Sequence, residues 1–284
     1  MSLKVSIIQS ELHWENVDQN LGMFAQKIEE ISTPTDIIVL PEMFNTGFSM
    51  DSSELAERMD GKTVSWMKDQ AIKSNAVITG SLIIKEIPLS GGARGGFFNR
   101  LIWAQPDGEL HTYDKRHLFR MAGEHDHFTA GDKRLIVSYK GWRICPLICY
   151  DLRFPVWARN KELSVDNVQH LGSTLNTHNS TQDVYDILIY VANWPAVRKQ
   201  PWSKLLEARA IENQCYVIGV NRVGEDGKGI AYSGNSVVVN PKGDVISSVS
   251  ENAATTESVD LSLAELNEFR EKFPVSLDGD DFTL

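Results

Sequence analysis

Cysteine and long apolar runs are both scarce in this sequence. Three cysteines among 284 residues are too few, and odd in number, for a disulfide-stapled scaffold, and they indicate free thiols in a reducing compartment. No apolar run approaches the about 20 residues of a membrane span. The first residues predict a β-strand over 4–9 rather than a signal peptide. We therefore expect a cytoplasmic protein without a membrane-spanning helix.

Positive charge is in deficit as well. The chain has 28 lysines and arginines against 38 aspartates and glutamates, which gives a net charge of −10. Binding to a phosphate backbone needs cations that displace counterions, and anionic membrane surfaces attract basic segments. The charge therefore argues against nucleic acid and membrane surfaces as partners. The hydrophobic fraction of 42% and the charged fraction of 23% are those of a globular protein.

Short β-branched runs alternate along the chain with amphipathic windows, a pattern typical of an α/β protein. Some runs, such as 37–40, are continuously apolar, as in strands covered on both faces. The expected strands are 4–9, 37–40, 77–84, 98–105, 142–148, 187–192, 217–221 and 236–240. The expected helices are 17–31, 62–74, 155–160, 202–213 and 263–272. Since no long linker divides the chain, residues 1–284 are expected to form one domain with sheets between helical layers.

Two stretches look like additions to such a domain. Residues 90–96 are mostly glycine and predict the tip of a hairpin. Residues 161–183 are polar, rich in Ser, Thr, Asn, Gln and His, and show little periodicity, so we interpret them as a surface insertion in the form of a loop. Long loops in compact domains are often functional, but a tolerated insertion fits this stretch equally well.

Two charged residues follow predicted strands. Glu42 comes just after the apolar run 37–40, and sites in open α/β sheets gather at the carboxyl ends of strands. Its apolar neighbours would partly remove it from water, which suits a general base. Lys115 follows a short strand-like run at 110–113 and has aromatic neighbours, so it could be a fixed cation in a pocket. Taken alone, each residue is more often an ordinary solvated surface group.

The third candidate is a cysteine at the end of a strand. The apolar run 142–148 ends at Cys149, and the next helix is expected to start at Pro155. A nucleophile at a strand-to-helix elbow is exposed, and adjacent backbone N–H groups point toward it. Cys145 lies deeper in the same strand, and Cys215 starts another apolar run. We expect both of these cysteines in the core.

In this order and with these flanking residues, Glu42, Lys115 and Cys149 resemble the catalytic residues of the nitrilase superfamily of carbon–nitrogen hydrolases. The resemblance extends from Lys4 to about residue 260. The segments LICYDLRFP at 147–155, YVANWP at 190–195, ARAIENQ at 208–214 and GVNRVG at 219–224 are most similar to the omega-amidase branch. That branch hydrolyses the terminal amide of 2-oxo acid amides such as 2-oxoglutaramate and 2-oxosuccinamate.

The resemblance implies an αββα four-layer sandwich whose protomers pair into a homodimer or a higher homo-oligomer. It also implies that Glu42 takes the thiol proton from Cys149 and that the thiolate attacks the amide carbon to form a thioester. Lys115 would lower the pKa of the thiol and, with the backbone N–H of Tyr150, would stabilise the oxyanion. No metal or organic cofactor is needed, because the nucleophile and the base are both protein groups.

Further residues complete the implied site. Glu124 matches a second glutamate of the family, which positions the lysine and the substrate. Arg153 is the candidate for the distal carboxylate of the substrate, because a guanidinium binds a carboxylate through two parallel hydrogen bonds. The alternative for Arg153 is an internal ion pair with Asp151. The candidates for the pocket wall are aromatic residues that would also suit an ordinary core: Phe44, Phe48, Phe119 and Trp194.

Several histidines near the lysine invite a metal interpretation, which the sequence does not favour. They are His111, His117, His125 and His127. The sequence has no helical His-x-x-x-His pair among them and no cysteine with ligand spacing, so the pattern of a zinc site is missing. We therefore expect no metal.

The leading expectation is a thiol-dependent amidase acting on a small 2-oxo acid amide. The same Glu–Lys–Cys triad also serves nitrilases and hydrolases of N-carbamoyl amines, and only the shape of the pocket distinguishes these activities. A catalytically inactive assembly or binding subunit is a further alternative. The presence of Glu42, Lys115 and Cys149 together disfavours it.

Overall fold

Two β-sheets organise the fold of the computed structural model, which describes residues 1–87, 95–161, 168–171 and 183–280. Within these residues each sheet has six strands. The order in the first sheet is β14 (Thr255–Ser262), β1 (Ser2–Gln9), β2 (Ile37–Val39), β3 (Val77–Glu86), β4 (Gly96–Ala104) and β5 (Leu110–Asp114). The order in the second is β13 (Val237–Val239), β10 (Tyr216–Val220), β9 (Ile187–Val191), β7 (Trp142–Ile148), β6 (Arg134–Tyr139) and β8 (Val168–Leu171).

Parallel strands form the centre of each sheet. In the first sheet β1, β2 and β3 are parallel, and β14, β4 and β5 are antiparallel to their neighbours. In the second sheet β7, β9 and β10 are parallel, β13 is antiparallel to β10, and β6 is antiparallel to β7 but parallel to β8. A small antiparallel ribbon joins β11 (Val223–Glu225) to β12 (Ala231–Ser233). The carboxyl ends of β2, β7 and β9 therefore become available for a site.

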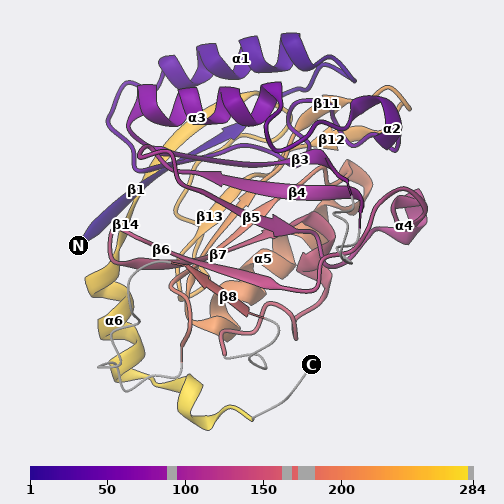
Figure 1. The fold of residues 1–284 in the computed structure, drawn as a ribbon. Helices are drawn as coiled ribbons and strands as arrows, with labels where there is room; N and C mark the ends of the chain where they lie inside the picture. The colour runs from indigo at the N-terminus through magenta and orange to yellow at the C-terminus, as the bar shows by residue number, and fades with distance from the viewer. Residues whose placement is uncertain (88–94, 162–167, 172–182, 281–284) are drawn as a thin grey trace.

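Helices cover the outer face of each sheet. Because side chains alternate along a strand, Ile37 and Val39 enter a core between the two sheets, whereas Ile38 enters a core beneath α1 (Val17–Glu29) and α3 (Lys62–Ser74). On the far side, α5 (Lys199–Asn213) packs against β10. Figure 1 shows α1 and α3 over the first sheet, with the second sheet and α5 on its other side. The four-layer sandwich that the resemblance implies is confirmed.

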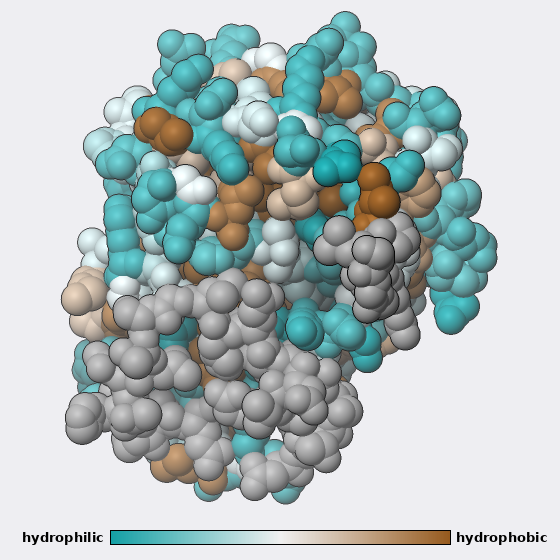
Figure 2. Space-filling model, in the orientation of Figure 1, coloured by the Kyte–Doolittle hydropathy of each residue, from teal (hydrophilic) through white to brown (hydrophobic). Residues whose placement is uncertain are grey.

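The boundaries of the long helices follow local signals. The side chain of Asn16 caps α1 by accepting a hydrogen bond from the Gln19 N–H at 3.1 Å. Asn75 ends α3 in the left-handed conformation at φ 50°. The buried residues Leu21, Phe24 and Ile28 lie on one face of α1. The opposite faces of α1 and α3 carry mostly hydrophilic side chains, as the top of Figure 2 shows.

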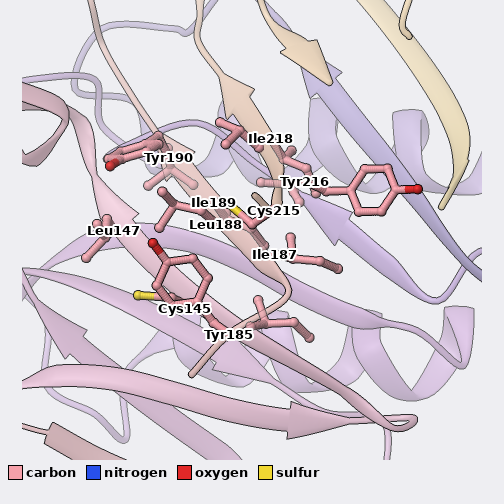
Figure 3. Packing of buried hydrophobic residues seen from close by; sticks show 14 of the residues in the cluster. Cys145, Leu147, Tyr185, Ile187, Leu188, Ile189, Tyr190, Cys215, Tyr216 and Ile218 are labelled. Atoms are coloured by element: carbon pink, nitrogen blue, oxygen red, sulfur yellow. The ribbon is translucent and has the colours of Figure 1, made fainter. Parts of the chain in front are cut away.

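The two cysteines expected in the core are both fully buried. Figure 3 shows Cys145 and Cys215 among apolar and aromatic side chains of β7, β9 and β10. Burial raises the pKa of the Cys145 thiol to about 12 and that of Cys215 well above its ordinary value. These two thiols are protonated and inert, as expected of structural cysteines.

Some expected elements are wrong. Residues 155–160 form no helix; a 3-10 helix, η2 (Cys149–Arg153), begins at the cysteine itself. The interpretation of 161–183 as loop fails at β8, which pairs parallel with β6; residues 162–167 and 172–182 lie outside the described residues. The hairpin around 90–96 is confirmed by the pairing of Glu86 with Gly96, although residues 88–94 are outside the description as well.

The remaining helices are short or lie at the edges of the sheets. They are α2 (Ser52–Leu55), α4 (Glu124–His127), α6 (Leu263–Lys272), η1 (Arg120–Ala122), η4 (Ala196–Arg198) and η5 (Val275–Asp278). None of the helices in the described part of the chain has the length and the apolar content needed to cross a bilayer.

Candidate active site

The four predicted catalytic side chains come together where several elements end. Glu42 follows β2, and Lys115 is the first residue after β5. Glu124 opens α4, and Cys149 follows the last residue of β7. Two sheets and the segments between them therefore supply one cluster. Glu42, Lys115 and Glu124 are each 0% exposed, and Cys149 is 8% exposed.

Lys115 joins the two glutamates. Its Nζ donates hydrogen bonds to Glu42 Oε1 at 2.8 Å and to both carboxylate oxygens of Glu124 at 2.9 Å. Such charge-assisted bonds are among the strongest in proteins. The Glu124 carboxylate also accepts from the backbone N–H of Phe119. Glu124 thus fixes both the lysine and the segment that carries it.

Two asparagines that the sequence did not single out hold Glu42. The Asn99 Nδ2 on β4 donates to Glu42 Oε1 at 2.8 Å and to Glu124 Oε1 at 3.1 Å. The backbone N–H of Asn193, just past β9, donates to Glu42 Oε2 at 2.8 Å, and its side-chain amide donates to the backbone oxygen of Glu42. Both glutamate oxygens are therefore oriented. Asn193 lies in the 190–195 segment of the resemblance, but Asn99 carries no sequence signal.

The charges of this cluster reinforce one another. Burial alone would lower the pKa of Lys115, but the attraction of Glu124 and Glu42 outweighs it, so the pKa of Lys115 is raised. Burial raises the pKa of Glu124, and the charge of Lys115 opposes that rise. Lys115 therefore remains an ammonium group at neutral pH, and it supplies a positive charge beside Cys149.

The pKa of the Cys149 thiol differs from the expectation. Burial raises its pKa well above the ordinary value, and the charge of Glu42 raises it further, while Lys115 lowers it. A hydrogen bond with Glu42 also favours the protonated thiol. The expected lowering by Lys115 is thus present but outweighed. The resting nucleophile is a thiol that faces a carboxylate rather than a preformed thiolate.

The backbone at the nucleophile is strained. Cys149 has φ 45°, in the left-handed region that non-glycine residues seldom adopt. The buried carboxylate of Asp151 holds this elbow: it accepts from the N–H of Ile148 at 3.1 Å, from the N–H of His117 at 2.9 Å and from the Tyr113 hydroxyl at 2.8 Å. Asp151 thereby ties the cysteine elbow to the segment that follows Lys115.

Tyr150, the predicted source of an oxyanion N–H, is the second residue of η2. The first backbone N–H groups of a helix have no partner within the helix. The N–H of Tyr150 is therefore one of the donors left over by the helix geometry. It belongs to the residue after the nucleophile, a position that supplies oxyanion donors in other hydrolases.

A pocket opens at Cys149. It contains about 530 Å³ of atom-free space, including its open mouth. Five of its twelve lining residues are aromatic, and two are arginines. The lining residues that matter for recognition are Phe48, Phe119, Tyr150, Arg153, Asn193, Trp194, Arg198 and Tyr232.

Three of the four predicted wall residues, Phe48, Phe119 and Trp194, line this pocket. Phe44 does not. Its ring is fully buried in the core beneath α1 and α3, 5.5 Å from the ring of Phe24. Gly80 on β3 makes room for it, because a Cβ at that position would lie 2.9 Å from the Phe44 ring. The chain turns after Glu42, so Phe44 points to the opposite face of the sheet.

Arg153 lies in the pocket and not on Asp151. Its guanidinium is 5.2 Å from the centre of the Trp194 ring. The Asp151 carboxylate is occupied by Tyr113, His117 and Ile148. The alternative of an internal ion pair between Arg153 and Asp151 is therefore wrong.

The histidines near Lys115 are engaged separately. The His117 Nδ1 lies 2.8 Å from Asp151, and its ring stacks on Phe154 at 3.8 Å between centres. The His111 ring contacts the side-chain amide of Gln105 at 2.9 Å. Across the described ranges, the His, Cys, Asp and Glu side chains form no group of three or more that could hold a metal ion.

The sequence is similar to those of known proteins along most of its length. The family model described as carbon–nitrogen hydrolase matches residues 4–271. The omega-amidase YafV of Escherichia coli (strain K12) is 46% identical over 282 residues, which cover 99% of this chain and 98% of that protein. The 2-oxoglutaramate amidase of Bacillus subtilis (strain 168) is 29% identical over 278 residues, which cover 97% of this chain and 96% of that protein.

Solved structures share the fold. XC1258 from Xanthomonas campestris, described as a CN-hydrolase superfamily protein with an arsenic adduct in the active site, superposes with a TM-score of 0.88 at 41% identity and covers 100% of this chain and 99% of its own. Nit3 of Saccharomyces cerevisiae, from branch 10 of the nitrilase superfamily, gives a TM-score of 0.79 at 23% identity, with 97% and 95% covered. The present chain is therefore an amidase that belongs to the carbon–nitrogen hydrolases of the nitrilase superfamily, in their omega-amidase branch.

Proposed function

We propose that this amidase hydrolyses the terminal amide of a small 2-oxo acid amide, such as 2-oxoglutaramate or 2-oxosuccinamate, through a thioester on Cys149. One observation carries the proposal. The buried cluster of Glu42, Lys115 and Glu124 lies beside a thiol in a pocket that also contains the guanidinium of Arg153. The thiol and the three buried side chains beside it suit acyl transfer, and the guanidinium suits a carboxylated substrate.

In the proposed reaction Glu42 takes the proton of the Cys149 thiol as the sulfur attacks the amide carbon. The C–S bond forms, and the electron pair of the carbonyl moves onto oxygen. When the C–N bond breaks, its electron pair stays on nitrogen, which receives the proton from Glu42 and leaves as ammonia. The raised pKa of the thiol supports a proton transfer that accompanies attack, since little free thiolate is available beforehand.

The thioester is then hydrolysed by water. Glu42 takes a proton from the water molecule, the resulting hydroxide attacks the thioester carbon, and the C–S bond breaks. The sulfur recovers the proton from Glu42, and the carboxylic acid product departs. The oriented oxygens of Glu42 support its use as base in both halves of the reaction.

The proposed oxyanion donors are the Lys115 ammonium and the N–H of Tyr150. The two glutamates keep Lys115 charged, so the donor does not depend on pH in the working range. Loss of one such donor typically costs a factor of about 10²–10³ in rate. Glu124 is proposed to position Lys115, because it binds the Nζ through both carboxylate oxygens.

The substrate is tested by measuring ammonia release by the wild-type protein from 2-oxoglutaramate, glutamine, a simple aliphatic nitrile and an N-carbamoyl amine. We expect fast release from 2-oxoglutaramate alone. Turnover of the nitrile or of the carbamoyl compound, with none of 2-oxoglutaramate, would retain the Glu–Lys–Cys chemistry and discard this substrate. No release from any of the compounds by protein with an intact thiol would favour an inactive binding subunit.

A further inference from the structure

The pocket contains a second cation that the proposed chemistry does not use. Arg198, the last residue of η4, lines the pocket together with Arg153. Neither guanidinium forms an ion pair with a carboxylate in the part of the chain that the structure describes. Two uncompensated positive charges in one pocket are notable in a chain whose net charge is −10. Such a pocket attracts an anion.

Each of the two guanidiniums lies on an aromatic ring. The Arg198 guanidinium is 5.4 Å from the centre of the Phe119 ring, and that of Arg153 is 5.2 Å from the centre of the Trp194 ring. An aromatic face holds a cation in place without neutralising its charge. Both guanidiniums therefore keep their hydrogen-bond donors available to a ligand.

The two rings are fixed to the rest of the site. The Trp194 Nε1 donates to the backbone oxygen of Arg198 at 2.7 Å, and the Trp194 N–H donates to Asn221 Oδ1 at 2.8 Å. The N–H of Phe119 donates to Glu124. The position of each arginine is thus linked to the walls around Cys149, which makes the pair a preorganised feature of the pocket.

We propose that Arg198 is a specificity-determining residue that acts with Arg153 to select a 2-oxo carboxylate and to reject the corresponding amino acid. This inference rests on the proposed amidase function. A 2-oxo carboxylate presents three neighbouring acceptor oxygens, and two guanidiniums present only donors. In glutamine or asparagine an ammonium group replaces the oxo oxygen. That group is a cation without acceptors, so two arginines repel it.

The test compares wild type, Arg198→Gln and the control Lys199→Gln. Lys199 is exposed, pairs with Glu251 at 2.7 Å and does not line the pocket, so its variant removes the same charge one residue away. We expect kcat/KM for 2-oxoglutaramate to fall about 10- to 100-fold in Arg198→Gln, mainly through KM, as for a lost charged hydrogen bond. The preference for 2-oxoglutaramate over glutamine should fall by a similar factor. Lys199→Gln should match wild type.

Two further measurements distinguish a loss of substrate recognition from a structural effect of the Arg198 substitution. The rate of Cys149 alkylation by iodoacetamide should be the same in Arg198→Gln and wild type, because the nucleophile is untouched. Arg198→Lys should keep much of the rejection of glutamine, since it keeps the charge, but should recover only part of the affinity for 2-oxoglutaramate.

An unchanged preference in Arg198→Gln, with wild type active on 2-oxoglutaramate, would overturn the inference. Slowed alkylation with equal losses on both substrates would also overturn it, by showing a merely structural role. If wild type itself ignores 2-oxoglutaramate while hydrolysing another amide, the proposed substrate fails first, independently of Arg198.

Discussion

A single buried ammonium group balances two buried carboxylates beside the nucleophile. Lys115 contacts Glu42 and Glu124 at 2.8 and 2.9 Å. Burial, and after it the charge of Glu42, raises the pKa of the Cys149 thiol, so the thiol stays protonated. A neutral thiol can react only if a base accepts its proton, so the activity depends on Glu42 as much as on the cysteine.

Replacing Glu42 with Gln should therefore make the Cys149 thiol more acidic and at the same time lower the turnover rate. Burial is the largest cause of the raised thiol pKa and remains, but the charge of Glu42, the next cause, is removed. The pKa of Cys149 should fall, and its alkylation by iodoacetamide should begin at lower pH than in wild type. Turnover should nevertheless drop by about 10³-fold or more, because the general base is gone.

The measurement is the rate of alkylation as a function of pH, over a range that extends well above the ordinary value of about 8.5 for a free thiol, beside ammonia release. An alkylation profile that moves to higher pH in Glu42→Gln would contradict the assigned electrostatics. Retained turnover would contradict the assignment of Glu42 as base.

The elbow between β7 and η2 stores backbone strain at the nucleophile. Cys149 has φ 45°, a conformation that costs a non-glycine residue about 1–2 kcal/mol. Glycine adopts it freely but is more flexible in the unfolded chain. At an ordinary position glycine is therefore less stable than alanine, and at this elbow the order should reverse.

Cys149→Gly should thus be more stable than Cys149→Ala by about 1 kcal/mol. Both variants lack the thiol, so activity does not confuse the comparison. Chemical denaturation of the two purified variants measures the difference in the free energy of unfolding. A Cys149→Gly variant that is clearly the less stable of the two would show that the elbow is not strained.

Helix α6 is anchored by a buried arginine. Arg270 donates to Asp186 Oδ1 at 2.8 Å and to the backbone oxygens of Gln214 and Tyr185 at 2.9 Å. Burial would raise the pKa of Asp186, but hydrogen bonds and charges from Arg143 and Arg270 outweigh it and lower that pKa. A carboxyl group with a lowered pKa stabilises the fold above its ordinary pKa of about 4 and loses this effect as the pH falls through the lowered value.

Arg270→Met should accordingly cost about 3 kcal/mol in the free energy of unfolding at pH 7, because it leaves a buried carboxylate with one partner fewer. The cost should shrink as the pH falls from about 4 through the lowered pKa of Asp186, where its carboxylate becomes protonated. Lys272→Met is the control, since Lys272 pairs with Glu268 at the exposed surface and should change little. A cost that is independent of pH would assign Arg270 to packing rather than to charge.

For the molecule as a whole, the sequence predicted the layers better than the edges. Helices 62–74 and 263–272 and strand 142–148 were predicted to the residue, because their apolar periodicity reflects burial that the sequence itself encodes. The edge strand β14 was missed. Its residues alternate between exposed and partly buried as far as Val259. The strand forms by antiparallel pairing with β1, in which Ser262 lies opposite Ser2. Such a pairing leaves no local signal.

In the candidate site, too, the sequence predicted some residues and missed others. The residues with a family motif, Glu42, Lys115, Cys149 and Glu124, were named from sequence and lie together. The residues that orient them depend on tertiary contact. Asn99 is 57 positions from Glu42, and Asn193 is 151 positions away. No spacing rule connects such residues, and only the fold brings them into hydrogen-bonding distance.

Ammonia release from 2-oxoglutaramate by wild type and by Cys149→Ala, measured in parallel, tests the central claim most directly. The variant should keep the thermal transition of a folded protein, because the substitution removes only the sulfur atom, whose hydrogen bond is to the side chain of Glu42. We predict multiple turnovers by wild type and a loss of about 10³-fold or more in the folded variant. Near-normal release by Cys149→Ala would contradict the thioester mechanism.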